Sequence, residues 1–313
     1  MKLKTLTIMS YMLASTVATT PLLAEDDWFK FYGKINVAFD QLDFEGEKSD
    51  WEFNSYASRI GLKGKGALTE NLELFYQYEW EVDVVFDSGD KFKERNQVVG
   101  LRGNWGEVFA GRHDTPTKTA QEKIDLFSDM PGDLKNTFNG DKRSAKMVQY
   151  TTPVMNNFKV KAAVITDEDD VDGEGFSTAA GYKAGGLLVG FAYDNDVEKE
   201  DLQTLRIMSR YKMADWQFGF MYQNSDYHDN SADGILLSTK YNFGDNTLKV
   251  QYYNSDIWDL GISSKIRYSD QVSLGYDRKL MKDLTAYGYY SEGKEGETES
   301  VDNIYGVGIV FKF

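Results

Sequence analysis

The chain has 313 residues, a formal net charge of −15, no cysteine and an aromatic content of 14%. This acidic balance argues against nucleic acid as a partner, because binding to phosphates requires basic patches. The absence of cysteine excludes disulfide bonds, thiolate metal sites and a cysteine nucleophile.

The N-terminus has the features of an export signal. Lys2 and Lys4 precede a mostly apolar stretch at 6–18, and Ala24 is followed by the acidic run at 25–27. This order predicts a secretory signal peptide at 1–24, cleaved after Ala24, and a mature domain at 25–313. An N-terminal membrane anchor is the alternative, which the shortness of the apolar run disfavours.

No later stretch approaches the roughly 18 apolar residues of a membrane helix. An exported chain of this kind is soluble or crosses a membrane as a β-barrel.

Hydrophobicity repeats with period two along the rest of the chain. From Phe29 to Phe39 every second residue is apolar or glycine, and Leu72 to Val82 shows the same alternation. Because successive side chains of a strand point to opposite faces, each such segment has one apolar and one polar face. The alternation is least regular in the fourth and fifth segments, around 98–101. Sixteen strands are predicted, at 28–40, 51–65, 71–84, 92–103, 106–113, 144–152, 157–166, 175–183, 187–194, 203–212, 215–224, 234–242, 246–254, 270–278, 283–291 and 304–313.

The connections between these segments alternate between short and long. The long set comprises 41–50, 85–91, 114–143, 167–174, 195–202, 225–233, 255–269 and 292–303. An even number of strands of about 10 residues, with turns at one end and loops at the other, is typical of outer-membrane barrels. The alternative is a secreted, soluble β-sandwich or β-helix, in which hydrophobicity also alternates. Tyr and Trp near the strand ends of the apolar face favour the barrel, whose interface girdles use these residues.

The longest connection, 114–143, carries apolar residues that a disordered loop would not need. We expect it to pack against the barrel, with a short helix around 119–128. Its acidic residues Asp125, Asp129 and Asp133 are spaced four apart. The apolar residues are Ile124, Leu126, Phe127, Met130, Leu134 and Phe138.

Basic side chains on the polar strand faces are expected to oppose these aspartates. In the stretch 58–64, Ile60 and Leu62 share one face, so Arg59 and Lys63 point into the lumen. The sequence thus predicts a constriction with a transverse field that orients polar solutes. In the alternative, the arginines pair with loop carboxylates and hold the loop in place. The predicted basic side is Arg59, Arg95, Arg143 and Lys63, and the predicted acidic side is Asp125, Asp129 and Asp133.

Several stretches resemble the general porins of Gram-negative outer membranes. They are Phe31-Tyr32-Gly33-Lys34, the stretches 58–64 and 99–108, Gly111 to Pro116, and the terminal Phe313. The resemblance implies a trimeric, water-filled barrel of sixteen strands whose third loop folds into the lumen. It places Arg59, Arg95 and Arg143 at positions of an arginine cluster facing that loop. It also implies that Phe313 is the signal read by the barrel assembly machinery.

The C-terminal segment predicts how the barrel closes. Tyr305, Val307, Ile309, Phe311 and Phe313 alternate with small or polar residues, so they face lipid or a neighbouring subunit. The segment 304–313 must then pair with 28–40 to leave no open edge.

The predicted function is passive diffusion of ions and small hydrophilic solutes through the outer membrane. The acidic loops favour a weak cation preference, which the basic cluster opposes. One alternative is a solute-specific channel, in which Phe75 and Tyr253 could stack on sugars. Another is a barrel enzyme, for which the chain offers only His113 and His228 and no nucleophile motif. We expect no cofactor.

An acidic stretch at 167–174 allows a divalent-cation site made of Asp167, Asp169, Asp170 and Asp172. Such ions could bridge the loops to lipopolysaccharide. The simpler interpretation is a solvated acidic loop, because the spacing is not that of an EF-hand.

Overall fold

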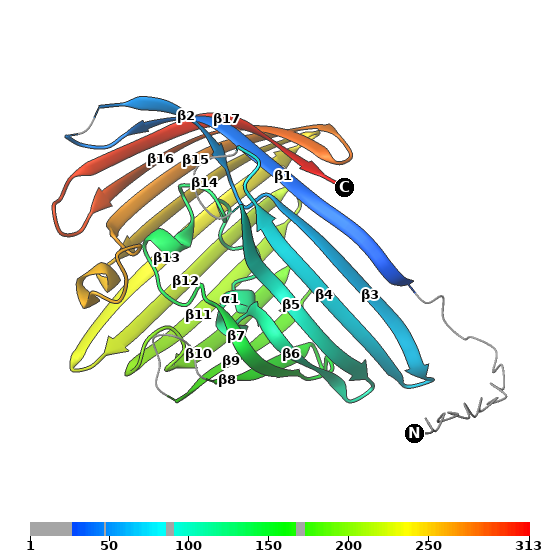
Figure 1. Ribbon diagram of the computed structural model, residues 1–313. Coiled ribbons are helices and arrows are strands. Elements are labelled where there is room, and N and C mark those ends of the chain that lie inside the picture. The colour runs from blue at the N-terminus through cyan, green and yellow to red at the C-terminus, as the bar shows by residue number, and fades with distance from the viewer. Residues whose placement is uncertain (1–26, 47, 86–90, 167–172) are drawn as a thin grey trace, which may run out of the picture.

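The computed structural model describes residues 27–46, 48–85, 91–166 and 173–313. The predicted signal peptide and the predicted cation site at 167–172 lie outside these residues. The strands form a single closed antiparallel sheet (Figure 1). Among the described residues, no helix is long and apolar enough to cross a membrane. The elements are β1 (Asp27–Asp43), β2 (Asp50–Ser55), β3 (Arg59–Thr69), β4 (Leu72–Val82), β5 (Phe92–Gly103), β6 (Gly106–Asp114), α1 (Pro116–Ala120), the 3-10 turn η1 (Leu134–Asn136), β7 (Arg143–Thr151), β8 (Phe158–Thr166), β9 (Glu174–Ala184), β10 (Leu187–Asn195), β11 (Leu202–Met213), β12 (Trp216–Tyr227), β13 (Asn230–Phe243), β14 (Asn246–Ser255), the 3-10 turn η2 (Ile257–Leu260), β15 (Tyr268–Met281), β16 (Leu284–Glu295) and β17 (Val301–Lys312).

The barrel closes between its first and last strands, as the sequence predicts. β1 pairs with β17 from Lys34↔Lys312 to Asp43↔Asn303. Beyond this ladder the backbone of Phe313 exchanges hydrogen bonds with Gly33, at 2.9 and 3.2 Å. β2 and β3 both pair with β1 and together correspond to the single predicted segment 51–65. The barrel therefore has sixteen transmembrane strands, and closure leaves no unpaired edge.

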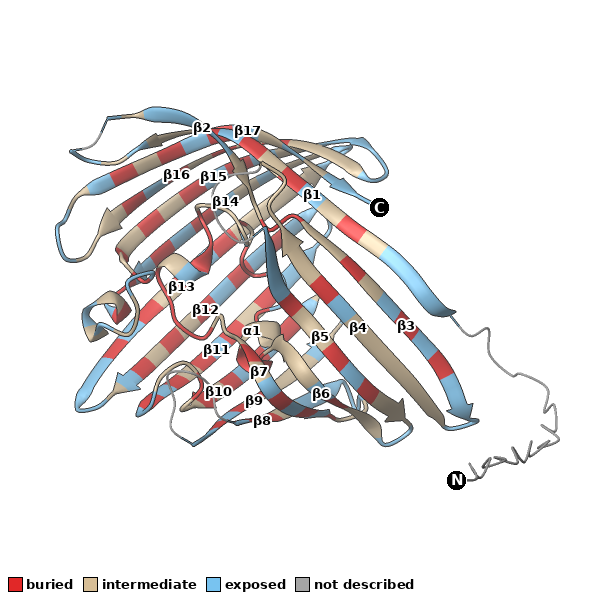
Figure 2. Ribbon diagram, in the orientation of Figure 1, coloured by how far each residue is buried: buried red, intermediate tan, exposed pale blue. Residues whose placement is uncertain are grey.

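The alternation of the sequence becomes an alternation of exposure around the barrel (Figure 2). On β12, Trp216, Phe218 and Phe220 are exposed on the outer face, whereas Gln217 and Gln223 are buried on the inner face. An apolar outer face suits contact with lipid, and a polar inner face suits a water-filled lumen. The predicted sidedness of β17 is confirmed in the same way, because Tyr305, Val307, Ile309, Phe311 and Phe313 are all exposed.

One predicted loop is far shorter than expected. The sequence predicts a connection at 225–233, but β12 extends to Tyr227 and β13 begins at Asn230. Only His228 and Asp229 join them, and His228 takes a positive φ of 52° as a tight turn requires. The prediction failed because most residues of these strand ends are polar on both faces. They carry no apolar alternation, although their backbones remain fully paired.

Three β-bulges lie on the strands that surround the long loop. Residues 56–58, between β2 and β3, interrupt the pairing of these strands with β1, and Ala57 has a φ of 47°. A second bulge in β5 contains Arg95, and a third in β7 contains Lys146 at φ 48°. A bulge inserts a residue and turns the side chains beyond it. The irregular alternation of β5 around 98–101 has a different cause, because the inward-facing Val98 is apolar and packs with Phe109 and Met147.

Candidate functional site

The long connection between β6 and β7 crosses the interior of the barrel (Figure 1). Its helix α1 begins at Pro116, and the hydroxyl of Thr115 caps it by accepting from the backbone of Lys118. The helix ends at Ala120, and Glu122 takes a positive φ of 47°. The predicted helix at 119–128 is therefore wrong. The actual helix starts earlier because proline suits the first helical position.

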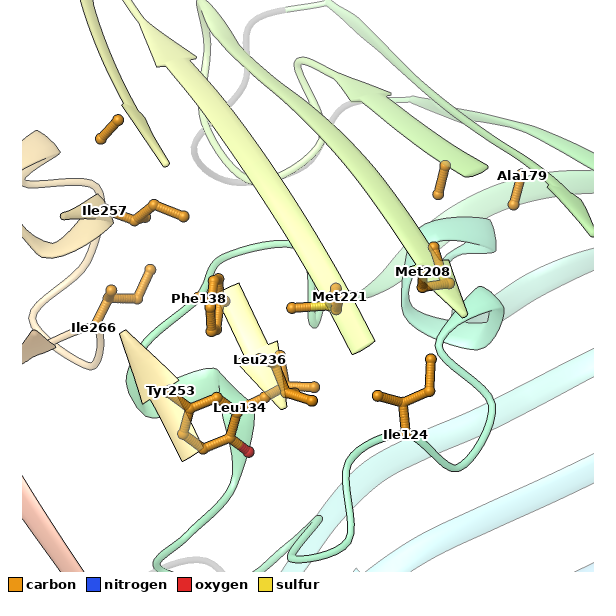
Figure 3. Close-up of a cluster of buried hydrophobic side chains, with 12 residues drawn as sticks. Ile124, Leu134, Phe138, Ala179, Met208, Met221, Leu236, Tyr253, Ile257 and Ile266 are labelled. Atoms are coloured by element: carbon orange, nitrogen blue, oxygen red, sulfur yellow. The ribbon is translucent and has the colours of Figure 1, made fainter. Parts of the chain in front are cut away.

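Apolar side chains fix this loop to the wall formed by β11–β14. Ile124, Leu134 and Phe138 are fully buried against residues of that wall (Figure 3). Burial of each such side chain stabilises the packed loop by about 1.5–3 kcal/mol. The prediction that the loop packs against the barrel is confirmed for these residues and for Phe127, which packs beside Tyr287 and Tyr289. The wall residues in the first cluster are Met208, Met221, Leu236 and Tyr253.

Neutral polar side chains of the same wall satisfy the backbone of the loop. Gln251 accepts from the backbone N–H of Leu126 at 2.7 Å and donates to the carboxylate of Asp125 at 2.9 Å. Tyr253 donates to the carbonyl of Gly132 at 2.9 Å. Because unpaired buried backbone groups are costly, these bonds help the loop to keep one conformation.

The opposite side of the loop meets charged residues of the first strands. The carboxylate of Asp129 lies 3.1 Å from the ammonium of Lys34 on β1 and 3.8 Å from the guanidinium of Arg59 on β3. The loop thus joins both walls of the barrel, and charged groups surround its tip. We call Lys34, Arg59, Arg95, Arg143, Glu79, Glu81, Asp114 and Asp129 the eyelet.

The other arginines of the eyelet are held by carboxylates of the strands. Arg95 is buried and contacts Glu79 at 2.7 Å and Glu81 at 2.9 Å, both on β4. Arg143 lies 2.9 Å from Asp114, at the end of β6. Every cation of the eyelet therefore has a carboxylate within 4 Å, and positive and negative groups are interleaved.

Burial and charge act differently on the buried Asp125 and on the partly exposed Asp129. Burial, together with the nearby charge of Asp133, raises the pKa of Asp125 to about 7. For Asp129, burial also acts to raise the pKa, but Lys34, Arg95 and Arg59 hold it below its ordinary value. Asp129 thus carries a negative charge at the eyelet, whereas Asp125 is a buried hydrogen-bond acceptor.

The structure brings together only part of the predicted constriction. Arg59, Arg95 and Arg143 lie in the eyelet, but among the predicted acids only Asp129 does. Asp133 caps η1 through the backbone N–H of Lys135. Lys63 lies below the eyelet, its ammonium 5.1 Å from the ring centre of Tyr32. Sequence reasoning missed Lys34, Glu79, Glu81 and Asp114, the first three of which could have been found by tracing each charge on the polar strand faces.

Below the loop, toward the short turns, the inner surface is mostly basic. We call this part of the lumen the vestibule. Several of its cations line two cavities of about 440 and 340 Å³. Its acidic residues in the described part of the chain include Asp27, Glu73, Glu107, Glu122 and Asp277. Its basic residues outnumber them and are Lys30, Lys63, Lys65, Arg102, Lys159, Lys161, Lys183, Arg210, Lys212, Lys240 and Lys249.

The residues of the alternative functions have other environments. Tyr253 is completely buried beneath the loop, and Phe75 lies under Arg102, so the two form no exposed track. The Nδ1 atom of His113 lies 2.8 Å from a backbone oxygen, and that of His228 lies 3.4 Å from Asp201. Within the described residues, no group of His, Asp and Glu could hold a metal ion.

Comparisons with known proteins agree with this architecture. The model of the Gram-negative porin family matches residues 10–298. The chain belongs to the Gram-negative porin family. It is an outer-membrane β-barrel channel and not an enzyme. Two relatives of this porin are the major outer membrane protein P.IB of Neisseria gonorrhoeae and the outer membrane porin protein 32 of Delftia acidovorans. The first is 23% identical over 90% of this chain and 94% of the relative. The second is 27% identical over 81% of this chain and 79% of the relative.

Solved structures share the fold of this porin. The anion-selective porin from Comamonas acidovorans superimposes with a TM-score of 0.79 at 19% identity, covering 92% of this chain and all of that one. OmpF of Salmonella typhi, solved with daunomycin, gives a TM-score of 0.75 at 15% identity, with coverage of 92% and 98%. The trimer form of OmpT of Vibrio cholerae gives a TM-score of 0.69 at 18% identity, with coverage of 92% and 100%.

Proposed function

We propose that this porin passes ions and small hydrophilic solutes by passive diffusion and weakly prefers anions. The observation that carries the proposal is the distribution of charge along the lumen. The eyelet is neutralised by its own ion pairs, and the vestibule has an excess of cations. A narrow lumen lined by one sign of charge raises the local concentration of ions of the opposite sign.

The sign of this preference is opposite to the one predicted from the sequence. That prediction rested on the charge of the whole chain and of the acidic loops, where solvent and salt screen the charges. Side chains inside the lumen lie closer to a passing ion and are screened less. One relative in fold is described as anion-selective, which supports the same sign.

We also propose a trimer, with the barrel wall around β1 and β2 as the contact surface. Phe39, Trp51 and Phe53 form a continuous exposed aromatic surface there, with ring centres 4.8 Å apart in both pairs. Phe313 remains our proposed signal for the assembly machinery, since its ring is exposed at the end of β17. Divalent cations and lipopolysaccharide remain proposed partners of the acidic loops.

Single-channel recording in a planar bilayer tests the proposed function. We expect stable, ohmic conductance steps in KCl, with closures in three equal levels if each subunit of a trimer has its own pore. The absence of any conductance from the purified, folded barrel would overturn passive diffusion. Single-level closures would overturn the trimer alone.

A further inference from the structure

A partly enclosed pocket opens on the lumen side of β8, β9 and β10, between these strands and the helix α1. Its volume is about 340 Å³, at the lower end of the range of small-molecule sites. The pocket has an apolar floor, since Leu188 and Ala179 are buried and their side chains face inward with Gly190. Ala120 of the helix and Val154 of the adjacent turn complete the apolar lining.

Two lysines at the pocket have no acidic partner among the described residues. Lys159 and Lys161 are two residues apart on β8, so both side chains point to its inner face. The ammonium of Lys161 donates to the hydroxyl of Thr119 at 2.7 Å. Within the described part of the chain, neither lysine lies within ion-pair distance of a carboxylate.

The nearest carboxylate of the pocket is already engaged. Glu122 lies 2.9 Å from the guanidinium of Arg210 and 4.0 Å from the ammonium of Lys183. The charge left over at the pocket is therefore positive. An apolar floor beside two unneutralised ammonium groups favours a ligand with an apolar body and one anionic end.

We propose that this pocket is a transit site for small amphiphilic monocarboxylates, with a benzoate-sized apolar body on the floor and the carboxylate between Lys159 and Lys161. The inference rests on the proposed diffusion function and adds a preferred class of solute to it. Lysine suits this role because its ammonium is a flexible point charge. Binding in a channel must be weak enough to release the solute, so we expect saturation in the millimolar range, on the order of −4 kcal/mol.

The test is channel block by benzoate, with acetate and benzyl alcohol as matched probes. Benzoate added on the short-turn side should reduce the KCl conductance in a saturable way. Acetate lacks the apolar body and benzyl alcohol lacks the charge, so neither should do so at the same concentration. Equal effects of benzoate and acetate would overturn the proposal.

Two variants locate the block. Lys161→Gln should weaken it about tenfold, whereas Lys65→Gln makes the same change of charge elsewhere in the vestibule and should retain it. Gly181 lines the pocket, and a Cβ atom there would meet no heavy atom closer than 4.0 Å. Gly181→Leu therefore has room to fill the pocket and should abolish the block.

Retention of the block in both pocket variants would place the site elsewhere and overturn the assignment. The KCl conductance measured before benzoate is added separates this result from a failure of the proposed function. A wild-type barrel that conducts KCl but ignores benzoate refutes only the transit site.

Discussion

The third loop contacts two walls of the barrel through different interactions. Against β11–β14 it buries Ile124, Leu134 and Phe138 and pairs its backbone with neutral side chains. Against β1 and β3 its contact is the partly exposed carboxylate of Asp129 with two cations. The difference separates two tasks. Apolar packing fixes the loop, because burial is worth several kcal/mol, whereas the ion pairs set the electric field of the passage at little gain in stability.

The largest effect should follow from loosening the apolar packing of the loop, which extends beyond the β11–β14 wall to Phe127 beside Tyr287 and Tyr289. Phe127→Ala removes a completely buried ring, and such truncations cost about 3–5 kcal/mol. Hydrogen exchange of the amides at 124–138 should accelerate strongly, and the channel should become noisy. Met130→Ala, at a half-buried position of the same loop, is the matched control and should have a smaller effect. Unchanged exchange in Phe127→Ala would show that the packing does not hold the loop.

Removal of the buried guanidinium of the eyelet should have the next largest effect. Arg95→Ala leaves Glu79 and Glu81 without their closest cation, and the loss of one partner of a buried pair costs about 3 kcal/mol. The reversal potential under a KCl gradient should move toward cations. The double variant Arg95→Ala, Glu79→Gln removes one charge of each sign and should move it back. A double variant as cation-preferring as the single one would contradict the pairing.

The wall contact and the eyelet contact should respond differently to pH. The raised pKa of Asp125, about 7, means that the packed loop binds this proton more tightly than the open loop does. Its contribution to stability therefore falls as the pH rises from about 4 to 7. The contribution of Asp129 to stability depends on pH in the opposite direction. Because its pKa is lowered, this contribution is present at neutral pH and is lost only in acid.

Hydrogen exchange at 124–138, corrected for the intrinsic rate, checks this expectation. Protection should be higher at pH 5 than at pH 8 in the wild type. Asp125→Asn should flatten the profile between about pH 6 and 7. Because burial also raises the pKa of Asp141 to about 6, part of the dependence should persist below pH 6. Protection that decreases in the wild type as the pH is lowered from 8 to 5 would contradict the assignment.

The smallest change in stability should come from the tip of the loop. Asp129→Asn removes the ion pairs with Lys34 and Arg59, which are worth about 0–1 kcal/mol each. The thermal midpoint should hardly move, whereas the reversal potential should shift toward anions. Asp229→Asn, in the exposed turn between β12 and β13, removes the same charge far from the lumen and should leave the potential unchanged. Equal shifts in both variants would show that only overall charge matters.

Local patterns predicted the barrel but not the contacts of its loop. Alternation found the sixteen strands and the closure of β1 with β17, because strand periodicity and sidedness are written along the chain. The bulges at Ala57, Arg95 and Lys146 were not predicted, since a bulge is a property of two paired strands. The polar ends of β12 and β13 were missed because their sequence shows neither the alternation of a strand nor a clear signal for the turn.

The candidate site was predicted in outline. The apolar residues of the loop signalled that it packs, but nothing in the sequence indicates that Gln251 and Tyr253 receive it. The spacing of Asp125, Asp129 and Asp133 suggested three equivalent acids. Folding gives them separate roles, because only Asp129 points at Lys34 and Arg59.

The reversal potential of the wild-type channel under a KCl gradient tests most directly whether the charges inside the lumen, rather than those of the whole chain, set its selectivity. With the basic vestibule in control, the potential should have the sign of a chloride preference and should shrink toward zero as salt screens the lumen charges. A potassium preference would contradict this account and assign control of the passage to the acidic loops.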